Sequence, residues 1–149
     1  MRYEICHTPF TPWQLSLQWS NDEIEQIEWC RQQLANSAPP PWLAAYFKGE
    51  HQALLEAPYR LQGTPFQRRL WQHLQQIPAG EPCHYGAIAA KLGTSARAVA
   101  AACRANRLAL VIPCHRVVAS CGLGGYMGAL AGDEVALKQQ LLQWESHRG

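Results

Sequence analysis

The chain has 149 residues, of which 48% are hydrophobic and 16% are charged; this much apolar surface can bury a core and excludes a mainly disordered protein. Its formal net charge at pH 7 is only +2, but residues 66–116 carry seven basic side chains and one acidic side chain, a net charge of +6. That middle third suits a polyanionic partner, although a solvated basic face explains the charge equally well. No apolar run approaches the roughly 18 residues of a membrane span.

The six cysteines include no Cys-x-x-Cys pair and lie at positions 6, 30, 83, 103, 114 and 121. This spacing excludes a zinc ribbon and a thioredoxin-like redox pair. The N-terminus also lacks the apolar segment of a secretory signal. We therefore expect reduced thiols, a cytoplasmic location and no association with membranes.

Residues 1–62 are expected to form a small region of mixed secondary structure. Alternating apolar and polar residues predict a strand over 15–19. Asn21 and Asp22 are candidate N-caps of a following helix. The apolar face of that helix would consist of Ile24, Ile27 and Leu34. After a proline run, which cannot continue a helix, a second short helix is expected over 42–47.

A boundary is expected at Gly63, and residues 63–149 form the second predicted domain. Thr64 is a candidate N-cap, and Pro65 suits the first position of a helix. Apolar residues at helical spacing continue as far as Ile77, where a Pro-Ala-Gly sequence ends the helix.

Two short helices, over 85–92 and 95–104, are joined by a turn that contains Gly93, which predicts a helix-turn-helix. The second helix combines alanines, which would allow close approach to a nucleic-acid groove, with arginines. The alternative is that its alanines face the core and its arginines face water. The alanines are Ala96, Ala98, Ala100, Ala101 and Ala102, and the arginines are Arg97, Arg104 and Arg107.

The last third of the chain predicts a strand, a loop and a helix. The apolar run 108–112 is of strand type and ends at Pro113. The glycine-rich residues 119–132 are expected to form a loop. Asp133 is a candidate cap for a final helix that ends near His147.

The chemical centre is the sequence Pro113-Cys114-His115-Arg116, which follows the predicted strand. A thiolate is a nucleophile, and the pKa of an unperturbed thiol, about 8.5, is lowered by a neighbouring imidazole or guanidinium. Taken alone, a cysteine beside a histidine is more often packing material than a catalytic group. A cysteine hydrolase fits this chemistry but leaves the arginine-bearing helix unexplained.

Seven motifs in a fixed order favour a catalytic role for Cys114 over a packing role. With them, the chain strongly resembles the O6-alkylguanine-DNA alkyltransferases, also called methylated-DNA–protein-cysteine methyltransferases, over about residues 41–149. The pentapeptide that contains Cys114 is close to diagnostic of that family. The motifs are Gly63-Thr64-Pro65-Phe66-Gln67, Ile77-Pro78-Ala79-Gly80, Tyr85-Gly86-x-Ile88-Ala89, Ala96-Arg97-Ala98-Val99, Asn106, Ile112-Pro113-Cys114-His115-Arg116-Val117 and Gly124-Gly125-Tyr126.

The resemblance implies the fold class α/β (α+β). A small, shortened N-terminal α/β region (1–62) would pack on a mostly helical C-terminal domain (63–149) that contains the helix-turn-helix and a short active-site strand. It also implies DNA repair by direct reversal, in which a methyl or larger alkyl group moves irreversibly from O6-alkylguanine to Cys114. The damaged nucleotide would first be flipped out of the duplex, each molecule would act once, and no metal or organic cofactor is expected.

The resemblance further implies roles for single residues. Cys114 would accept the alkyl group, His115 would deprotonate it through a water molecule, and Glu145 would orient His115. Tyr85 would lie near the target nucleotide and donate a proton to the leaving guanine. The substrate pocket would include Asn106, Val117, Tyr126 and Met127.

The second helix of the helix-turn-helix would enter the minor groove of double-stranded DNA. Arg97 would take the place of the flipped nucleotide in the base stack. The residues expected to contact DNA are Tyr85, Ala96, Arg97, Ala100 and Arg104. We expect a monomer, and cooperation between molecules on DNA stays open.

The chain departs from the family pattern near the expected pocket. Arg107 replaces the proline that usually follows Asn106, and Met127 occupies a position that is often small or polar. Residues 131–137 look like an insertion of about five residues before the last helix. These changes leave the range of alkyl groups, and activity on O4-alkylthymine, open.

Some family members bind structural zinc in their N-terminal part. Cys6, His7 and Cys30 offer at most three ligands, and no convincing fourth is found, so we predict no metal site. The cysteines expected to be structural are Cys83, Cys103 and Cys121.

Two other functions are weighed against alkyl transfer. An alkyltransferase-like protein flips alkylguanine and recruits other repair factors without transfer, but such proteins usually replace the cysteine that is present here as Cys114. A regulator that reads the major groove would need polar side chains on its second helix, which is mostly alanine in this chain.

Overall fold

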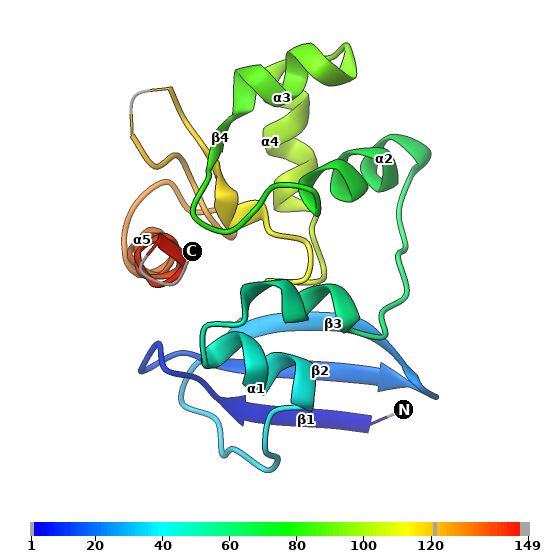
Figure 1. Cartoon of the computed structure of the whole chain (residues 1–149), viewed down its shortest axis with the longest axis vertical. Coiled ribbons are helices and arrows are strands. Elements are labelled where there is room, and N and C mark those ends of the chain that lie inside the picture. Colours follow the sequence, from blue (N-terminus) through cyan, green and yellow to red (C-terminus); the bar gives the residue numbers. More distant parts are fainter. Residues whose placement is uncertain (1, 121, 147–149) are drawn as a thin grey trace. The chain divides into compact units, whose positions relative to one another are not determined.

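The computed structural model describes residues 2–120 and 122–146, which form two units (Figure 1). The first unit comprises the chain up to Gln62 together with Arg107–Val111, a segment that the sequence analysis assigns to the second domain. The second unit comprises Gly63–Asn106 and the chain from Ile112 onward. A small sheet and several helices confirm the mixed α/β class. Among the described residues, no helix is both long and apolar enough to cross a membrane.

A three-stranded antiparallel sheet forms the first unit, in the order β1 (Arg2–His7), β2 (Gln14–Ser20) and β3 (Glu23–Cys30). The second strand confirms the strand that the alternating pattern predicts over 15–19. Two helical segments follow the sheet along the chain, namely α1 (Pro41–Phe47) and the 3-10 helix η1 (His51–Glu56). The first of these confirms the helix expected after the proline run.

The prediction of a helix after Asn21 is wrong, because this part of the chain forms β3. Asn21 has a φ of 56° and forms a two-residue turn with Asp22 between β2 and β3. The pairing of β3 with β2 contains a β-bulge, which adds one residue between Ile24 and Ile27. Both isoleucines are therefore buried although they lie three positions apart, a spacing that imitates a helix face. Leu34 lies outside any helix and is exposed.

The strand expected over 108–112 does not form. Leu108 makes a single parallel bridge to Ile27 at the edge of β3, where two backbone hydrogen bonds of 2.8 and 3.2 Å flank the bridge. Leu110 then adopts a φ of 69°, in the left-handed region, which ends the extended pairing. The short strand near Cys114 is instead β5 (Val117–Val118).

Helices and one short two-stranded parallel ladder, β4 with β5, build the second unit. The elements of this unit are α2 (Pro65–Leu74), β4 (Cys83–His84), α3 (Tyr85–Leu92), α4 (Ala96–Arg104), the 3-10 turn η2 (Cys114–Arg116), β5 and α5 (Asp133–Ser146). The indole of Trp71 in α2 donates to the carbonyl of Ala102 over 3.0 Å, which fixes α2 against α4.

Local sequence signals set the ends of α2, α3 and α4. At the start of α2, the Thr64 hydroxyl accepts from the Gln67 N–H (3.1 Å) and the Gln67 side chain accepts from the Thr64 N–H (3.0 Å), a capping box. Gly93 ends α3 with a φ of 67°. Ser95 caps α4, since its hydroxyl accepts from the Ala98 N–H over 3.1 Å.

The insertion at 131–137 lies mainly inside α5. This helix begins at Asp133 and reaches Lys138 at its sixth residue. The carbonyl of Gly132 accepts the first helical hydrogen bond, over 3.0 Å, so Gly132 and not Asp133 occupies the N-cap. The end expected near His147 lies outside the described residues.

Replacing Thr64 tests the capping box. Thr64→Ala removes the acceptor at the start of α2, so we expect the free energy of unfolding to fall by about 1 kcal/mol. Urea denaturation followed by tryptophan fluorescence measures the change. Thr64→Ser keeps a capping hydroxyl and should remain close to the parent protein; equal losses in both variants would contradict this role.

Candidate active site

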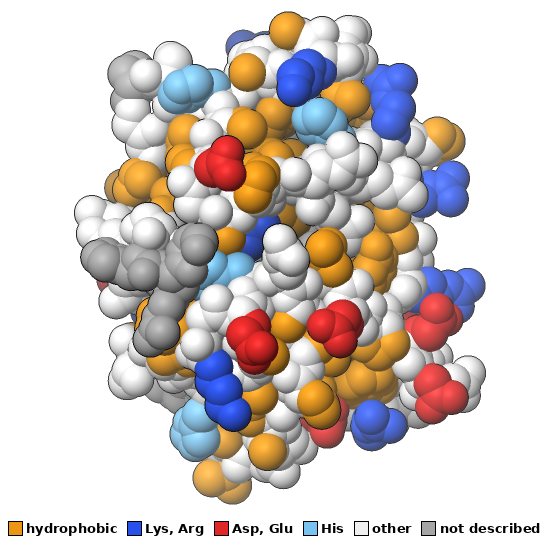
Figure 2. Space-filling model, in the orientation of Figure 1, with side chains coloured by type: hydrophobic (Ala, Val, Ile, Leu, Met, Phe, Trp, Pro, Cys, Tyr) orange, Lys and Arg blue, Asp and Glu red, His pale blue; other side chains and the backbone are white. Residues whose placement is uncertain are grey.

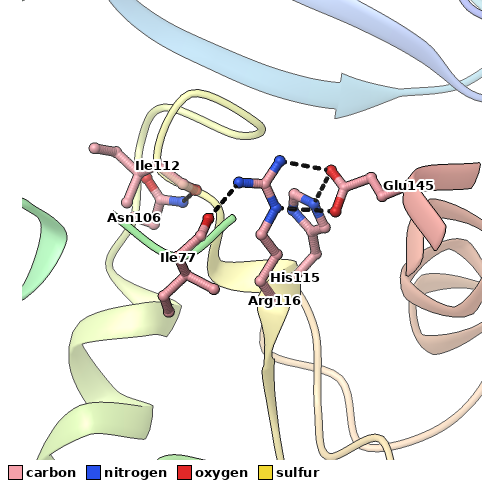
Figure 3. Close-up of polar contacts among 6 residues, drawn as sticks. All are labelled: Ile77, Asn106, Ile112, His115, Arg116 and Glu145. Atoms are coloured by element: carbon pink, nitrogen blue, oxygen red, sulfur yellow. Dashed lines mark hydrogen bonds and ion pairs between the residues drawn. The ribbon is translucent and has the colours of Figure 1, made fainter. Parts of the chain in front are cut away.

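Cys114 lies in η2, directly after Pro113, and is 6% exposed. The side chain of Asn106, which follows the end of α4, donates to the Ile112 carbonyl over 2.9 Å (Figure 3). The same amide nitrogen lies 3.3 Å from Sγ of Cys114. Asn106 thus ties the end of α4 to the turn that carries the thiol.

Interaction with the thiol of Cys103, in the last turn of α4, and burial raise the pKa of Cys114 well above its ordinary value. The same interaction lowers the pKa of Cys103. The resting Cys114 therefore keeps its proton at neutral pH and needs a base to become a nucleophile.

Three buried side chains meet at η2: His115 and Arg116, which belong to this turn, and Glu145 of α5 (Figure 3). The Glu145 carboxylate, on α5, accepts from Nε2 of His115 over 2.8 Å. It also accepts from Nε and Nη2 of Arg116, over 2.9 and 2.8 Å. Arg116 in turn donates from Nη1 to the carbonyl of Ile77 over 2.8 Å. Each charge in this cluster has a partner of opposite sign, as burial requires.

This cluster sets the protonation of His115. Burial alone would raise the pKa of Glu145, but His115 and Arg116 outweigh it and hold that pKa well below its ordinary value. Burial lowers the pKa of His115 despite the adjacent carboxylate, so the imidazole is neutral at pH 7. Because Nε2 donates to Glu145, Nδ1 is the basic atom, and in the described part of the chain this buried Nδ1 makes no hydrogen bond.

Lys138, which the sequence analysis does not single out, is fully buried on α5. Its ammonium group donates to the carbonyls of Val117, Leu123 and Gly125 over 2.6, 2.6 and 3.0 Å. Burial lowers the pKa of Lys138 to about 8. A lone basic residue between two buried leucines of one helix is the signal that could have revealed it. Lys138 joins α5, β5 and the glycine-rich loop by one side chain.

Tyr85 is the first residue of α3 and lies against the glycine-rich loop. Gly124 has a φ of 75°, and a Cβ there would lie 3.0 Å from the Tyr85 ring, so only glycine permits this approach. Burial raises the pKa of Tyr85 to about 12, so the phenol keeps its proton at neutral pH. The ammonium of Lys138 lies 5.7 Å from the centre of the ring.

A tight hairpin in the loop carries two of the predicted pocket residues. Tyr126 is buried and exchanges two backbone hydrogen bonds of 2.9 Å with Ala129. Met127 and Gly128 form the turn, with φ values of 55° and 81°. The Met127 side chain is 44% exposed at the tip of the hairpin. Val117, a third predicted pocket residue, is buried in β5.

The outer face of α4 combines small and basic side chains. Val99 and Ala102 are buried and Ala100 is half-buried, so the alanines divide between the core and the surface. The exposed residues of the helix are Ala96, Arg97, Ala101 and Arg104. Figure 2 shows Lys and Arg side chains over the part of the second unit that carries α2, α3 and α4. Such a surface can approach a polyanion closely.

This arrangement can pair a nucleophile with a base and an orienting carboxylate. Cys114 carries the thiol, Nδ1 of His115 makes no hydrogen bond to the described residues, and Glu145 fixes the tautomer of His115. This is the logic of the hydrolytic triads applied to a thiol. The basic face of α4 belongs to the same unit as Cys114.

Comparison with known proteins identifies similar sequences. A family model described as the DNA-binding domain of 6-O-methylguanine DNA methyltransferase matches residues 65–147. The chain is 45% identical to a methylated-DNA–protein-cysteine methyltransferase of Salmonella typhimurium over 101 residues, 66% of this chain but only 59% of that relative. A relative of the same name from Metallosphaera sedula is 34% identical over 152 residues, which cover 97% of this chain and 93% of the relative.

Solved structures of similar proteins share the fold. The O6-methylguanine methyltransferase of Mycobacterium tuberculosis has a TM-score of 0.79 and 31% identity, over 99% of this chain and 94% of that one. A structure of the M. tuberculosis protein in complex with DNA matches with the same TM-score and 32% identity.

Replacing Lys138 tests its structural role. Lys138→Met leaves three carbonyl groups without their donor, a cost that is partly offset because no charge is then buried. We expect the free energy of unfolding to fall by about 2 kcal/mol and amide exchange to rise in the segment that follows β5. Lys91→Met, at an exposed lysine of α3, is the control. Equal stability of the two variants would show that Lys138 does not hold the loop.

Proposed function

The chain belongs to the 6-O-methylguanine DNA methyltransferase family, and on that premise we propose that it repairs DNA by direct reversal. An alkyl group, methyl in the simplest case, passes irreversibly from O6 of a guanine in DNA to Sγ of Cys114. The observation that carries this proposal is the buried His115–Glu145 pair next to a buried thiol, with an Nδ1 on His115 that makes no hydrogen bond to the residues that the structure describes.

The first step is the formation of a thiolate. The proton of Cys114 passes through one water molecule to Nδ1 of His115. Glu145 stabilises the imidazolium that results, and the hydrogen bonds from Arg116 keep Glu145 ionised. Because the pKa of Cys114 is raised, the resting thiol is a poor nucleophile for other electrophiles until this transfer takes place.

The second step is the displacement itself. The sulfur attacks the alkyl carbon, the bond from that carbon to O6 breaks, and guanine keeps the electron pair. Tyr85, whose phenol stays protonated at neutral pH, donates a proton to the leaving base. The product is a thioether that water does not cleave, so each molecule reacts once. These steps call for no metal ion or organic cofactor.

Access to O6 requires the nucleotide to leave the base stack. We infer that α4 enters the minor groove of double-stranded DNA, with Ala96 and Ala100 permitting close approach and Arg104 near the phosphates. Arg97 fills the gap that the flipped nucleotide leaves. The exposure of Ala96, Arg97 and Arg104 supports this docking mode. The protein acts as a monomer.

Transfer is favoured over lesion binding without transfer. A protein that only flips and marks alkylguanine has no need of a thiol with a base and a carboxylate behind it. In this chain Asn106 contacts the thiol, and Glu145 holds the adjacent His115.

Intact-protein mass spectrometry tests the reaction directly. After mixing with a duplex that contains one O6-methylguanine, we expect a gain of one methyl group per molecule, mapped by peptide analysis to Cys114, and restored guanine in the DNA. Cys114→Ala should bind the damaged duplex but gain no mass. Methyl transfer that persists in Cys114→Ala, or a modified residue elsewhere, would refute the assignment of the acceptor.

Replacing Arg97 separates flipping from chemistry. Arg97→Ala should slow repair of the duplex by about tenfold or more, because an inserted arginine offsets part of the unstacking cost of a few kcal/mol. Its reaction with free O6-benzylguanine, which needs no flipping, should stay close to that of the parent. Arg60→Ala, at an exposed arginine of the first unit, is the charge-matched control. Equal losses on both substrates would mean that Arg97 serves the fold or the chemistry instead.

A further inference from the structure

The helix α2 donates one side-chain hydrogen bond to each helix of the helix-turn-helix, and the proposed mechanism uses neither donor. Nη2 of Arg69 donates to the carbonyl of Leu92, the last residue of α3, over 3.1 Å. The indole of Trp71 donates to the carbonyl of Ala102, in the last turn of α4, over 3.0 Å. One contact therefore lies just before the turn that leads into α4, and the other lies at the C-terminal end of α4.

The two ends of α4 lead to different parts of the proposed site. Arg97, which the proposed function places in the base stack, lies in the first turn of α4. Asn106, whose Nδ2 lies 3.3 Å from Sγ of Cys114, follows the last turn. A restraint on the start of α4 therefore bears on docking to DNA, and a restraint on its end bears on the reactive thiol.

We propose that Arg69 and Trp71 are positioning residues for α4. Arg69 sets the start of this helix for docking on DNA, and Trp71 sets its end, from which Asn106 reaches the thiol. Neither residue touches the reacting atoms. The role in repair rests on the proposed function, whereas the restraint on α4 does not.

The packing around Trp71 makes its indole a fixed donor. The side chain is 3% exposed, and a Cβ at Gly63 would lie 2.7 Å from a carbon of its ring, so only glycine packs this closely on the ring. In α1, by contrast, the buried indole nitrogen of Trp42 has no hydrogen-bond partner among the described residues. Trp42 is therefore a matched control, because its replacement by Phe removes ring area without removing a hydrogen bond.

Arg69 acts on the end of α3 by its charge as well as by its hydrogen bond. The last carbonyl groups of a helix carry a partial negative charge, which a nearby guanidinium stabilises. The guanidinium carbon also lies 5.8 Å from the centre of the Phe66 ring, which helps to hold the side chain in place. Because Gly93 ends α3 directly after Leu92, this contact restrains the turn that precedes α4. The neighbouring Arg68 is exposed and provides a control of equal charge.

Rates on two substrates test the role of Arg69. Arg69→Gln should slow methyl transfer from a duplex that contains O6-methylguanine by about fivefold, which corresponds to the loss of about 1 kcal/mol. Its reaction with free O6-benzylguanine, which needs no docking of α4, should match that of the parent. Arg68→Gln removes the same charge and should leave both rates close to the parent values. Equal losses in the two variants, no loss in Arg69→Gln, or a loss on the free base overturns the role of Arg69.

The same two substrates test Trp71 with a different expected result. Trp71→Phe should slow both reactions by about fivefold, because the end of α4 that leads to Asn106 and the thiol is no longer fixed. Trp42→Phe should react like the parent. All rates are measured at a temperature at which thermal unfolding shows every variant to be fully folded, so that lower stability does not enter. Parent rates in Trp71→Phe, or equal losses in Trp42→Phe, overturn the role of Trp71.

Amide hydrogen exchange of the full-length protein tests the restraint without DNA. Arg69→Gln should raise exchange in the N-terminal half of α4 and Trp71→Phe in its C-terminal half, with α5 unchanged in both. If exchange rises in this way but the parent gains no alkyl group from either substrate, the proposed function is wrong and the restraint on α4 stands. If the parent reacts but neither variant changes the exchange of α4 or the rates, the function stands and the positioning role is wrong.

Discussion

The buried carboxylate of Glu145 is the interaction on which the site depends. An ion without exposure to solvent is tolerated only when its hydrogen-bonding positions are filled by oppositely charged or polar donors. Here Arg116 supplies two of these donors and His115 supplies one. The second guanidinium branch of Arg116 binds the carbonyl of Ile77. Through Arg116, one anion thus fixes α5, η2 and the segment after α2 in a single arrangement, which also sets the tautomer of His115.

Two buried cations on or near η2 perform different tasks. Arg116 neutralises Glu145, and its planar head fits the carboxylate with two hydrogen bonds. Among the described residues Lys138 has no carboxylate partner, and it instead closes the glycine-rich loop through three carbonyl groups. The loop has little side-chain bulk of its own with which to pack, so a buried ammonium replaces the apolar contacts that usually hold such a segment. The positive charge that this requires acts to lower the pKa of the Cys114 thiol, but the interaction with Cys103 and burial outweigh it.

Structure that is decided locally can be predicted from the sequence. The caps at Thr64 and Ser95 and the glycine that ends α3 follow from residues within a few positions of each helix end. Structure that depends on distant parts of the chain cannot be predicted in this way. The bulge in β3 depends on pairing with β2, and it gives Ile24 and Ile27 a spacing that equally suits a helix.

The same division holds for the site. The motif around Cys114 and the position of Glu145 are visible in the sequence, because the family resemblance assigns both of them. The burial of Lys138 depends on contacts of α5 with β5 and with the glycine-rich loop, so its neighbours in the sequence hint at burial but do not show what the ammonium binds. The segment after Asn106 reads as a strand from its apolar residues alone, although its burial comes from a bridge to β3.

The segment 107–111 also limits how the protein can be truncated. Residues 107–111 belong to the first unit, yet they are flanked on both sides by chain of the second, between Asn106 and Ile112. A recombinant fragment that starts at Gly63 would keep these residues but lose β3, so Leu108, which is buried in the full chain and bridges Ile27, would lose its partner strand. Such an exposed apolar turn promotes aggregation. The N-terminal sheet is therefore not a detachable accessory, and a minimal version of this protein has to retain it or to redesign the turn with polar residues.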